Sequence, residues 1–345
     1  RHRMMQRRTL IKTGAAVALG APGLSGLAQR SVTLKFHTFM APQSAVYLTM
    51  HKAWMDKVEK DSGGRIKFEG YPAMQLGGTP VQLYDQAKDG VVDVVWTLPG
   101  NTAGRFPRTE VFELPFMMNN AEATSKAFWE YIQTEGADEY KDTQVLALHV
   151  HGPGMFHTTD RQIKSAADLK GLKMRGPTRQ VTKLLSSLGA TPVGMPLPAI
   201  TDALSKGTIN GCVIPWEVVP SVKVHELVKF HTEFPPNSTA LYTTTFVMAM
   251  NKAKYNSLSP ELKKVIDANS GPEASAWAGK VFAEADIPGR KMAEDRKNTL
   301  YTIPASELAL WRKAAEPVQI EWIKEVNRRD LPGLALVESA QALIA

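Results

Sequence analysis

Two segments of this chain repeat one design, and this repeat constrains the fold more than any other feature of the sequence. Residues 83–96 (LYDQAKDGVVDVVW) and 200–216 (ITDALSKGTINGCVIPW) each read as a helix, a glycine, an apolar run and a tryptophan. Gly90 and Gly207 suit the left-handed residue that ends a helix, and the apolar runs suit strands buried on both faces. Such strands occur in mostly parallel sheets covered by helices, so the repeat predicts two α/β lobes.

Strand and helix patterns also alternate along the rest of the chain from Ser31, as is typical of α/β proteins. The first series predicts strands at 32–38, 63–72, 91–96 and 143–150, and helices at 46–58, 79–89 and 121–141. The second series predicts strands at 171–177, 190–195 and 209–215, and helices at 178–188 and 198–206. A chain of 345 residues has the length for about two such domains.

From Pro260 onward the chain is dominated by long helical patterns, with Ser259 and Ser306 at positions that suit helix capping. Pro288 and Pro317 lie inside these patterns. Each predicts a kink or a break, because proline lacks an N–H and clashes with the preceding turn. We expect the long helices to brace both lobes.

The repeat also predicts where a ligand binds. In open parallel sheets, ligands bind beyond the carboxyl ends of the strands. Trp96 and Trp216 close the two repeated units, so we expect them at the mouths of the two lobes, facing a shared cleft. Together with Phe39, they either belong to the core or form the walls of an apolar pocket.

The positive charge of the chain is concentrated at its N-terminus. Of a formal net charge of +7, five charges come from residues 1–28, which contain no acidic residue. A basic region with adjacent Arg7 and Arg8 precedes a short, weakly apolar run that ends at Ala28, which is typical of a cleaved export signal and resembles the twin-arginine type. Removal of this segment leaves 7 − 5 = +2. The charge then gives no reason to expect nucleic acid as a partner.

Motifs of catalysis are absent from the sequence, which contains no GxSxG, HExxH, Walker or Rossmann pattern. His149, His151 and His157 lie close together in the sequence and could bind a metal, but histidines in strands are more often structural. An exported hydrolase or lyase of aromatic acids that uses these histidines is the alternative from another class. The single cysteine, Cys212, lies in an apolar run and is expected to be buried.

Arg175 is the residue whose position most favours anion binding. It ends an apolar strand pattern, precedes Gly-Pro, and lies just before the start of a helix. A guanidinium group offers a planar pair of donors that matches a carboxylate, and helix N-termini favour negative charge. The alternative is an arginine exposed to solvent, the usual environment of this residue type.

Three stretches of the sequence resemble one protein family. GRIKFEGYPAMQLGG, QAKDGVVDVVWTLPGNTAGRFPRTEVFELPF, and IKSAADLKGLKMRGPTRQVTKLLSSLGATPVGMPLPAITDALSKGTINGCV are similar to the DctP family. These are the periplasmic solute-binding proteins of TRAP (tripartite ATP-independent periplasmic) transporters. The resemblance extends from about Val32 to about Val326.

The resemblance implies a two-lobed periplasmic binding protein fold, with a mixed, mostly parallel sheet in each lobe and the ligand in the cleft between them. It implies that the arginine of the family's GLKxR element, here Arg175, binds the substrate carboxylate. It further implies a small organic acid as ligand and membrane permease subunits as partners. With it we expect a periplasmic monomer that performs no catalysis and needs no cofactor or metal.

The sequence departs from the sialic-acid-binding members of this family at three polar positions, where Leu98, Met155 and Ile214 are apolar. A pocket of this kind leaves the hydroxyl groups of a sugar acid unpaired, which costs about 1–3 kcal/mol each. We therefore expect an aromatic or hydrophobic monocarboxylate, such as a benzoate, a mandelate or an aryl 2-oxo acid. A C4-dicarboxylate or a 2-oxo acid is the alternative within the family. The predicted ligand-binding residues are Phe39, Trp96, Thr97, Leu98, Asn101, Met155, Arg175, Ile214, Trp216 and Tyr242.

Glu217 lies beside Trp216, which makes a cation next to the ligand conceivable, but we assign no metal and expect Glu217 to be a rim or structural acid. The predicted domain boundaries are an export signal at 1–28, lobe I at 31–152 plus about 241–280, lobe II at 153–240 plus about 281–330, and a C-terminal tail at 331–345.

Overall fold

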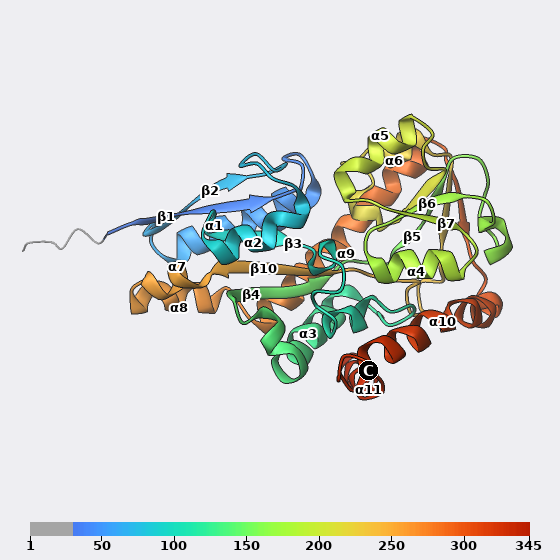
Figure 1. Cartoon of the computed structure of the whole chain (residues 1–345). Helices are drawn as coiled ribbons and strands as arrows, with labels where there is room; N and C mark the ends of the chain where they lie inside the picture. Colours follow the sequence, from blue (N-terminus) through green and yellow to red (C-terminus); the bar gives the residue numbers. More distant parts are fainter. Residues whose placement is uncertain (1–29) are drawn as a thin grey trace, which may run out of the picture. The chain divides into compact units, whose positions relative to one another are not determined.

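Strands and helices alternate along residues 30–345, the part of the chain that this computed structural model describes (Figure 1). They form two sheets with helices packed around them, as the repeated units predict. Both sheets belong to one compact unit, residues 31–345. The predicted export signal at 1–28, with Arg7 and Arg8, lies outside the described residues.

The first sheet, with its helices, is called lobe I below. Its strands run in the order β2-β1-β3-β10-β4. β1 is parallel to β2 and β3, whereas β10 is antiparallel to β3 and β4. The strands are β1 (Val32–Thr38), β2 (Ile66–Tyr71), β3 (Val94–Thr97), β4 (Thr143–Val150) and β10 (Thr245–Asn251), and the helices α1 (Ala53–Asp61), α2 (Leu83–Asp89), α3 (Ala121–Tyr131), α7 (Lys252–Ser257) and α8 (Pro260–Ala268).

The second sheet, with its helices, is called lobe II. Its order is β11-β9-β5-β8-β6-β7. β6 is parallel to β7 and β8, whereas β5 is antiparallel to β8 and β9. The strands are β5 (Met155–Thr158), β6 (Lys173–Gly176), β7 (Thr191–Gly194), β8 (Gly211–Ile214), β9 (Phe230–Glu233) and β11 (Thr299–Thr302), and the helices α4 (Arg179–Ser187), α5 (Ile200–Ser205) and α6 (Val224–Leu227).

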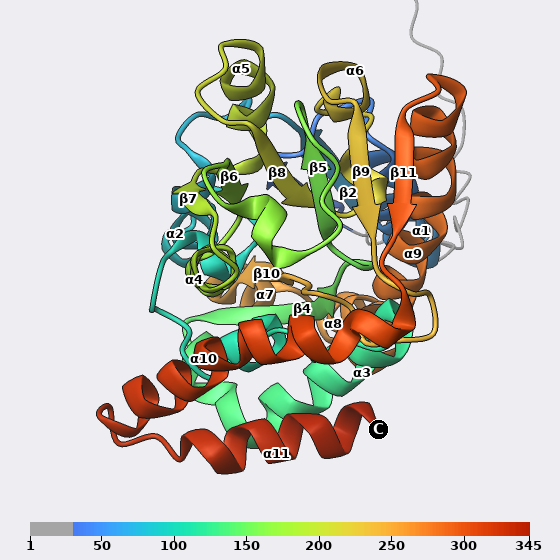
Figure 2. The same cartoon turned by 90° about the vertical axis from the view of Figure 1, so that its right-hand side faces the viewer.

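Three C-terminal helices complete the fold: α9 (Pro272–Asp295), α10 (Leu308–Asn327) and α11 (Gly333–Ile344). α9 packs on α3 of lobe I and on the short 3₁₀ turn η9 (Trp216–Val218) of lobe II. α10 packs on α4, and α11 packs on α3 and α10 (Figure 2). The segment that the sequence analysis treats as a tail, 331–345, therefore holds a further helix packed against lobe I.

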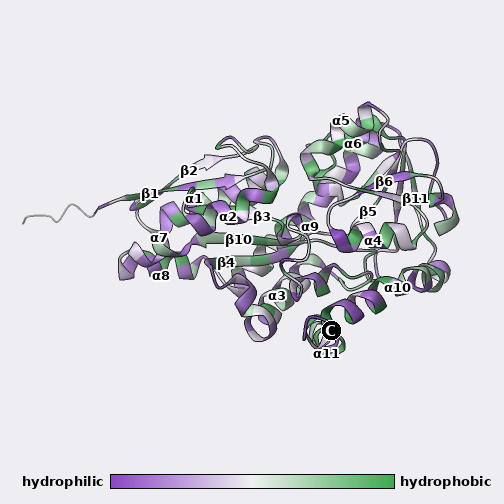
Figure 3. Cartoon of the chain, in the orientation of Figure 1, coloured by the Kyte–Doolittle hydropathy of each residue, from purple (hydrophilic) through white to green (hydrophobic). Residues whose placement is uncertain are grey.

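The repeated units form as their glycines predict. Gly90 follows α2 with φ +79°, and Gly207 follows α5 one residue later, with φ +70°. The strands that come next, β3 and β8, are buried along their whole length. Figure 3 shows that β10, an inner strand of lobe I next to β3, is also largely hydrophobic.

Two predictions about the C-terminal helices are only partly right. The Ser259 side chain caps α8 by accepting from the N–H of Leu262, but Ser306 does not cap α10, whose N-cap residue is Glu307. α9 and α10 continue through Pro288 and Pro317 without a break. None of the helices in residues 30–345 combines the length and the apolarity that a membrane crossing requires.

Candidate functional site

A cavity with an empty volume of about 510 Å³ lies where strands and loops of the two lobes meet. Seven of the ten residues predicted to bind a ligand line it: Phe39, Trp96, Leu98, Asn101, Arg175, Ile214 and Tyr242. They come from both lobes, because β1 and β3 carry the first four toward the space that β6, β8 and the segment before β10 border from the other side.

Lobe I supplies an aromatic wall to this cavity. The ring of Trp96 stacks on Phe246 of β10, with ring centroids 4.6 Å apart and planes 16° apart. Phe39 and Phe282 approach the same indole at 5.5 and 5.9 Å. The indole N–H of Trp96 donates to Nε2 of His149 at 2.9 Å, which fixes the orientation of the ring. The wall is therefore apolar and held in place from behind.

Lobe II supplies a positive charge to the cavity. Arg175, at the end of β6, is 3% exposed. Its Nε donates to the carbonyl of Met195 at 2.9 Å and its Nη1 to the carbonyl of Val213 at 3.3 Å. No salt bridge of residues 30–345 involves Arg175, and burial lowers the pKa of its guanidinium. A buried cation paired only with neutral carbonyls is costly, and an anion placed in the cavity would remove that cost.

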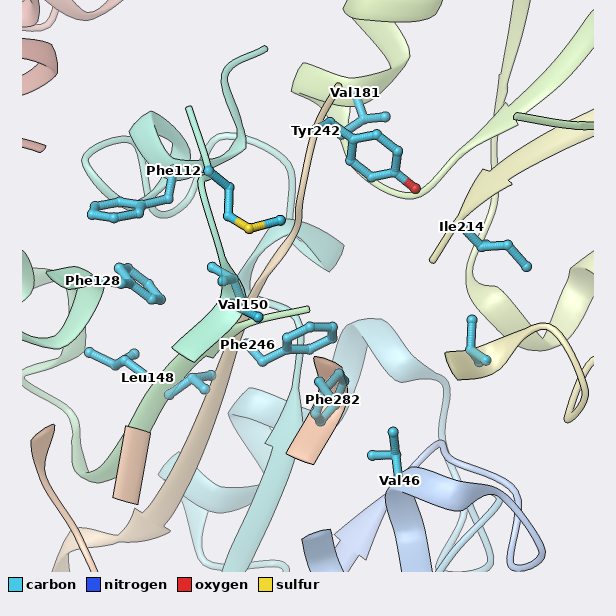
Figure 4. Packing of buried hydrophobic residues seen from close by; sticks show 14 of the residues in the cluster. Val46, Phe112, Phe128, Leu148, Val150, Val181, Ile214, Tyr242, Phe246 and Phe282 are labelled. Atoms are coloured by element: carbon cyan, nitrogen blue, oxygen red, sulfur yellow. The ribbon is translucent and has the colours of Figure 1, made fainter. Parts of the chain in front are cut away.

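Two further polar groups of the cavity have no hydrogen-bond partner: the hydroxyl of Tyr242 and Oε2 of Glu217. Burial raises the pKa of both groups well above their ordinary values. Asp286 of α9 raises the pKa of Glu217 further and accepts a hydrogen bond from its backbone N–H at 2.8 Å. Figure 4 shows the Tyr242 hydroxyl and Ile214 on the side of the cavity opposite Phe246 and Phe282.

The three histidines considered as a metal site have separate environments. His149 lies behind Trp96 in lobe I, and His157 of β5 pairs with Nδ1 of His231 in lobe II. Only His151 lines the cavity, where its Nε2 accepts from the N–H of Thr244. Burial lowers the pKa of His149 to about 3 and that of His151 and His157 to about 4. Within residues 30–345, no three His, Cys, Asp or Glu side chains are arranged to hold a metal.

The remaining predicted residues, Thr97, Met155 and Trp216, do not line the cavity. Thr97 ends β3 between the lining residues Trp96 and Leu98, so the alternation of side chains directs it to the other face. Met155 is paired with Ile214 across β5 and β8 but lies outside the cavity lining. The Trp216 ring packs on His157 and His231, at 5.3 and 4.9 Å, because Pro215 ends the strand and η9 turns the indole into lobe II.

The predicted ligand-binding residues omit several lining residues: Met40, Pro80, Pro196, Val218, Thr244, Phe246 and Phe282. His151 and Glu217, which the sequence singled out as a possible metal ligand and as a rim or structural acid, also line the cavity. Thr244, just before β10, and Phe246, within it, are two residues apart and both face the cavity. They lie far from the repeated units in the sequence, and no motif there indicates a ligand site. Phe282 comes from the middle of α9, so only the packing of that helix on both lobes brings it to the site.

A network of charged residues joins the lobes beside the cavity. Arg179, at the first position of α4, donates to both carboxylate oxygens of Glu110 at 2.9 Å, and also to Glu325 of α10 at 2.6 Å. Glu110 lies on the 3₁₀ turn η4 (Thr109–Glu113) of lobe I and also accepts from Gln180. This ion pair therefore links α4, four residues beyond Arg175, to the opposite lobe.

Residues 36–325 match the DctP family model, described as bacterial extracellular solute-binding protein, family 7. Among solved structures, a TRAP solute-binding protein from Rhodoferax ferrireducens T118 with copurified benzoate is 68% identical to this chain. It superimposes with a TM-score of 0.90 over 91% of this chain and 98% of that one.

Two further structures are similar. A marine metagenome TRAP solute-binding protein, described as specific for aromatic acid ligands and crystallised with 3-hydroxybenzoate, is 52% identical, with a TM-score of 0.90 over 91% of this chain and 98% of that one. A TRAP periplasmic solute-binding protein from Bordetella bronchiseptica with bound (R)- and (S)-mandelate is 26% identical, with a TM-score of 0.82 and the same coverage of 91% and 98%.

Proposed function

Because this chain belongs to family 7 of the bacterial extracellular solute-binding proteins, the DctP family, we propose that it captures an aromatic monocarboxylate and delivers it to a TRAP membrane permease. The observation that carries the proposal is Arg175, a buried guanidinium in an aromatic cavity with no carboxylate partner in the described part of the chain. A ligand carboxylate supplies the missing negative charge.

Arg175 is held in place to receive this carboxylate. Its Nε and Nη1 bind backbone carbonyls, so the rest of the planar group is presented in a fixed orientation. Charge-assisted hydrogen bonds from a guanidinium to a carboxylate are about twice as strong as neutral ones. The unpartnered hydroxyl of Tyr242 offers a further donor beside it. Together these two residues can donate hydrogen bonds to one ligand carboxylate.

The lining favours one carboxylate over two. Arg175 is the only Lys or Arg among the described residues that line the cavity, and Glu217 is an acid. The second carboxylate of a C4-dicarboxylate would lie against the aromatic wall or near Glu217, without a cation to pair with, and a buried unpaired charge is strongly unfavourable. A flat aromatic ring instead gains stacking contacts with Trp96 and Phe246.

The three similar structures support the same ligand class. Their bound molecules, benzoate, 3-hydroxybenzoate and mandelate, each combine one carboxylate with one aromatic ring. The fit of this combination to Arg175 and the aromatic wall does not depend on those structures, because it follows from the lining residues of this chain.

The site supports binding rather than catalysis. The exported hydrolase or lyase requires His149, His151 and His157 to act together, and they face different surroundings, with only His151 at the cavity. We further propose that the protein acts as a periplasmic monomer without a cofactor, exported by the twin-arginine route. The sequence of residues 1–28 supports export, and the family description as extracellular, with a mandelate-bound relative described as periplasmic, supports the location.

A thermal-shift screen of the purified protein against organic acids tests the proposal. We expect benzoate-like acids to raise the melting temperature, since a ligand at 100 times its Kd adds about 2.7 kcal/mol to the free energy of unfolding. Succinate and glucuronate should give no shift. Ligand recovered unchanged after incubation agrees with transport, whereas turnover of the acid or a preference for dicarboxylates would contradict the proposal.

A further inference from the structure

Resting on the proposed function, we infer that Glu217 is a specificity-determining residue whose carboxyl group hydrogen-bonds a polar substituent on the ring of the bound acid. The cavity leaves the Tyr242 hydroxyl and Oε2 of Glu217 unpartnered. The ligand carboxylate, bound at Arg175, gives the Tyr242 hydroxyl a hydrogen-bond partner. An unsubstituted aromatic ring offers no hydrogen-bond partner to Glu217.

The backbone around Glu217 is fixed, so the direction of its side chain is fixed as well. The N–H of Glu217 donates to Oδ1 of Asp286 at 2.8 Å. α9 lies directly against η9 at this point. The two backbones are so close that a Cβ atom on Gly289 would overlap the carbonyl of Trp216. The Glu217 side chain leaves this support toward the cavity and is 5% exposed as a residue.

The surroundings of Glu217 favour the neutral, protonated form of its carboxyl group. Burial raises its pKa well above its ordinary value, and Asp286, whose own pKa burial raises to about 7, acts in the same direction. The nearest arginine on α9, Arg290, is paired with Glu233 and Glu294 instead. A protonated carboxyl group both donates and accepts hydrogen bonds. It therefore tolerates an anionic ligand in the same cavity.

Arg175 and Glu217 act at different ends of the ligand. Tyr242 lies near both of them: burial raises its pKa, Arg175 lowers it and Glu217 raises it further. The pKa of Glu217 itself responds to burial and to Asp286. With the carboxylate held by Arg175, the part of the ligand that reaches Glu217 is the ring edge. A hydroxyl or amino group there satisfies Oε2, whereas a hydrogen or a methyl group leaves it unpartnered.

The first experiment uses the wild-type protein and a ligand series. Calorimetry gives Kd for benzoate, the three hydroxybenzoates and the three methylbenzoates, which match the hydroxyl in size. At one ring position we expect the hydroxyl to bind about 10-fold more tightly than the methyl, the scale of one buried hydrogen bond. Equal affinities at every position would overturn the inference. Failure of all seven acids to bind would instead overturn the proposed function.

The second experiment assigns the preference to Glu217. In Glu217→Leu the ratio of the hydroxybenzoate affinity to the methylbenzoate affinity should fall below about 2-fold. Glu217→Gln should keep most of this preference, because an amide also donates and accepts. Val218→Ala, at the next lining position, is the matched control and should leave the ratio unchanged. Glu217→Met replaces the Leu variant if that protein does not fold. A preference that survives in the apolar variant refutes the role of Glu217.

Discussion

The two lobes contain the same helix-glycine-strand-tryptophan design, yet their tryptophans have different roles. Trp96 lies within β3, lines the cavity and donates its N–H to His149. Trp216 follows β8 after Pro215, packs on His157 and His231, and leaves its N–H without a partner. The residue of β8 that does reach the cavity is Ile214.

This difference shows that the repeat determines the strand but not which residue at its end faces the ligand. Trp96 is the sixth residue after Gly90, whereas Trp216 is the ninth after Gly207. The three additional residues carry Trp216 past the end of the strand. Lobe I therefore presents aromatic rings to the cavity, while lobe II presents Arg175 and Glu217, and Tyr242 comes from the segment that leads into β10. We expect the lobes to differ accordingly when each contribution is removed.

Replacement of the guanidinium group of Arg175 should have the largest effect. In Arg175→Lys the positive charge remains but the planar pair of donors is lost, so we expect Kd for benzoate to rise about 100-fold, or about 2.7 kcal/mol. Arg161→Lys is the matched control, because Arg161 also lies in lobe II and donates to backbone carbonyls, of Asp168 and Lys170. Calorimetry gives both affinities. Near-native affinity in Arg175→Lys would show that the planar pair of donors of Arg175 does not bind the ligand carboxylate.

Replacement of each tryptophan by leucine tests directly whether Trp96 and Trp216 have different roles. Trp96→Leu removes a stacked ring from the cavity wall and leaves His149 without its donor, so we expect benzoate binding to weaken about 10-fold or more. Trp216→Leu should lower the melting temperature, since Trp216 is buried, but change Kd by less than about 2-fold. Equal losses of affinity in the two variants would mean that Trp216 reaches the ligand in solution.

The elements that the sequence predicted correctly are those with a local signal. Glycines after helices and apolar runs located β3 and β8, and the strand end before Gly-Pro located Arg175. The Trp216 prediction was wrong for the cavity because Pro215 and η9 turn the indole away, and no local pattern records that turn. Phe282 was missed because α9 brings it into place from outside the two repeats. Glu217, which follows Trp216 directly, was expected as a rim or structural acid, and it lines the cavity.

A smaller loss of affinity is expected at the ion pair that joins the lobes. Arg179 contacts Glu110 and Glu325 but does not line the cavity, so it holds the two lobes together in the arrangement of this structure. In Glu110→Gln we expect Kd to rise about 3- to 10-fold, mainly through faster dissociation, because part of the ligand's binding free energy must then hold the lobes together. Lys183→Gln, which removes a contact of Glu325 within lobe II and α10, is the control. Stopped-flow dissociation rates separate the two variants, and unchanged rates in Glu110→Gln would contradict the expected role.

We expect the smallest effect on binding at His157, which contacts the cavity-lining residue Ile214 but does not line the cavity itself. Its replacement should instead change how stability depends on pH. Its Nε2 hydrogen-bonds the carbonyl of Ile214 and its Nδ1 pairs with His231, whose Nε2 interacts with Asn298. His157→Gln keeps a donor for Ile214, so benzoate affinity at pH 7 should change by less than about 2-fold. The stability of the variant should nevertheless respond differently to acid.

The direction follows from the pKa of His157, which burial lowers from 6.5 to about 4. Between these two pH values the unfolded chain binds a proton at this residue and the folded protein does not. Acidification therefore removes about 1.4 kcal/mol of stability per pH unit through this one group. Asp286 works in the opposite direction, because its raised pKa of about 7 makes the folded protein bind the extra proton. The two effects overlap in the wild-type curve, so only the variant isolates the histidine. Urea unfolding from pH 7 to pH 4 should give a flatter curve for His157→Gln by about that slope, and parallel curves would mean that His157 gains its proton in the folded state.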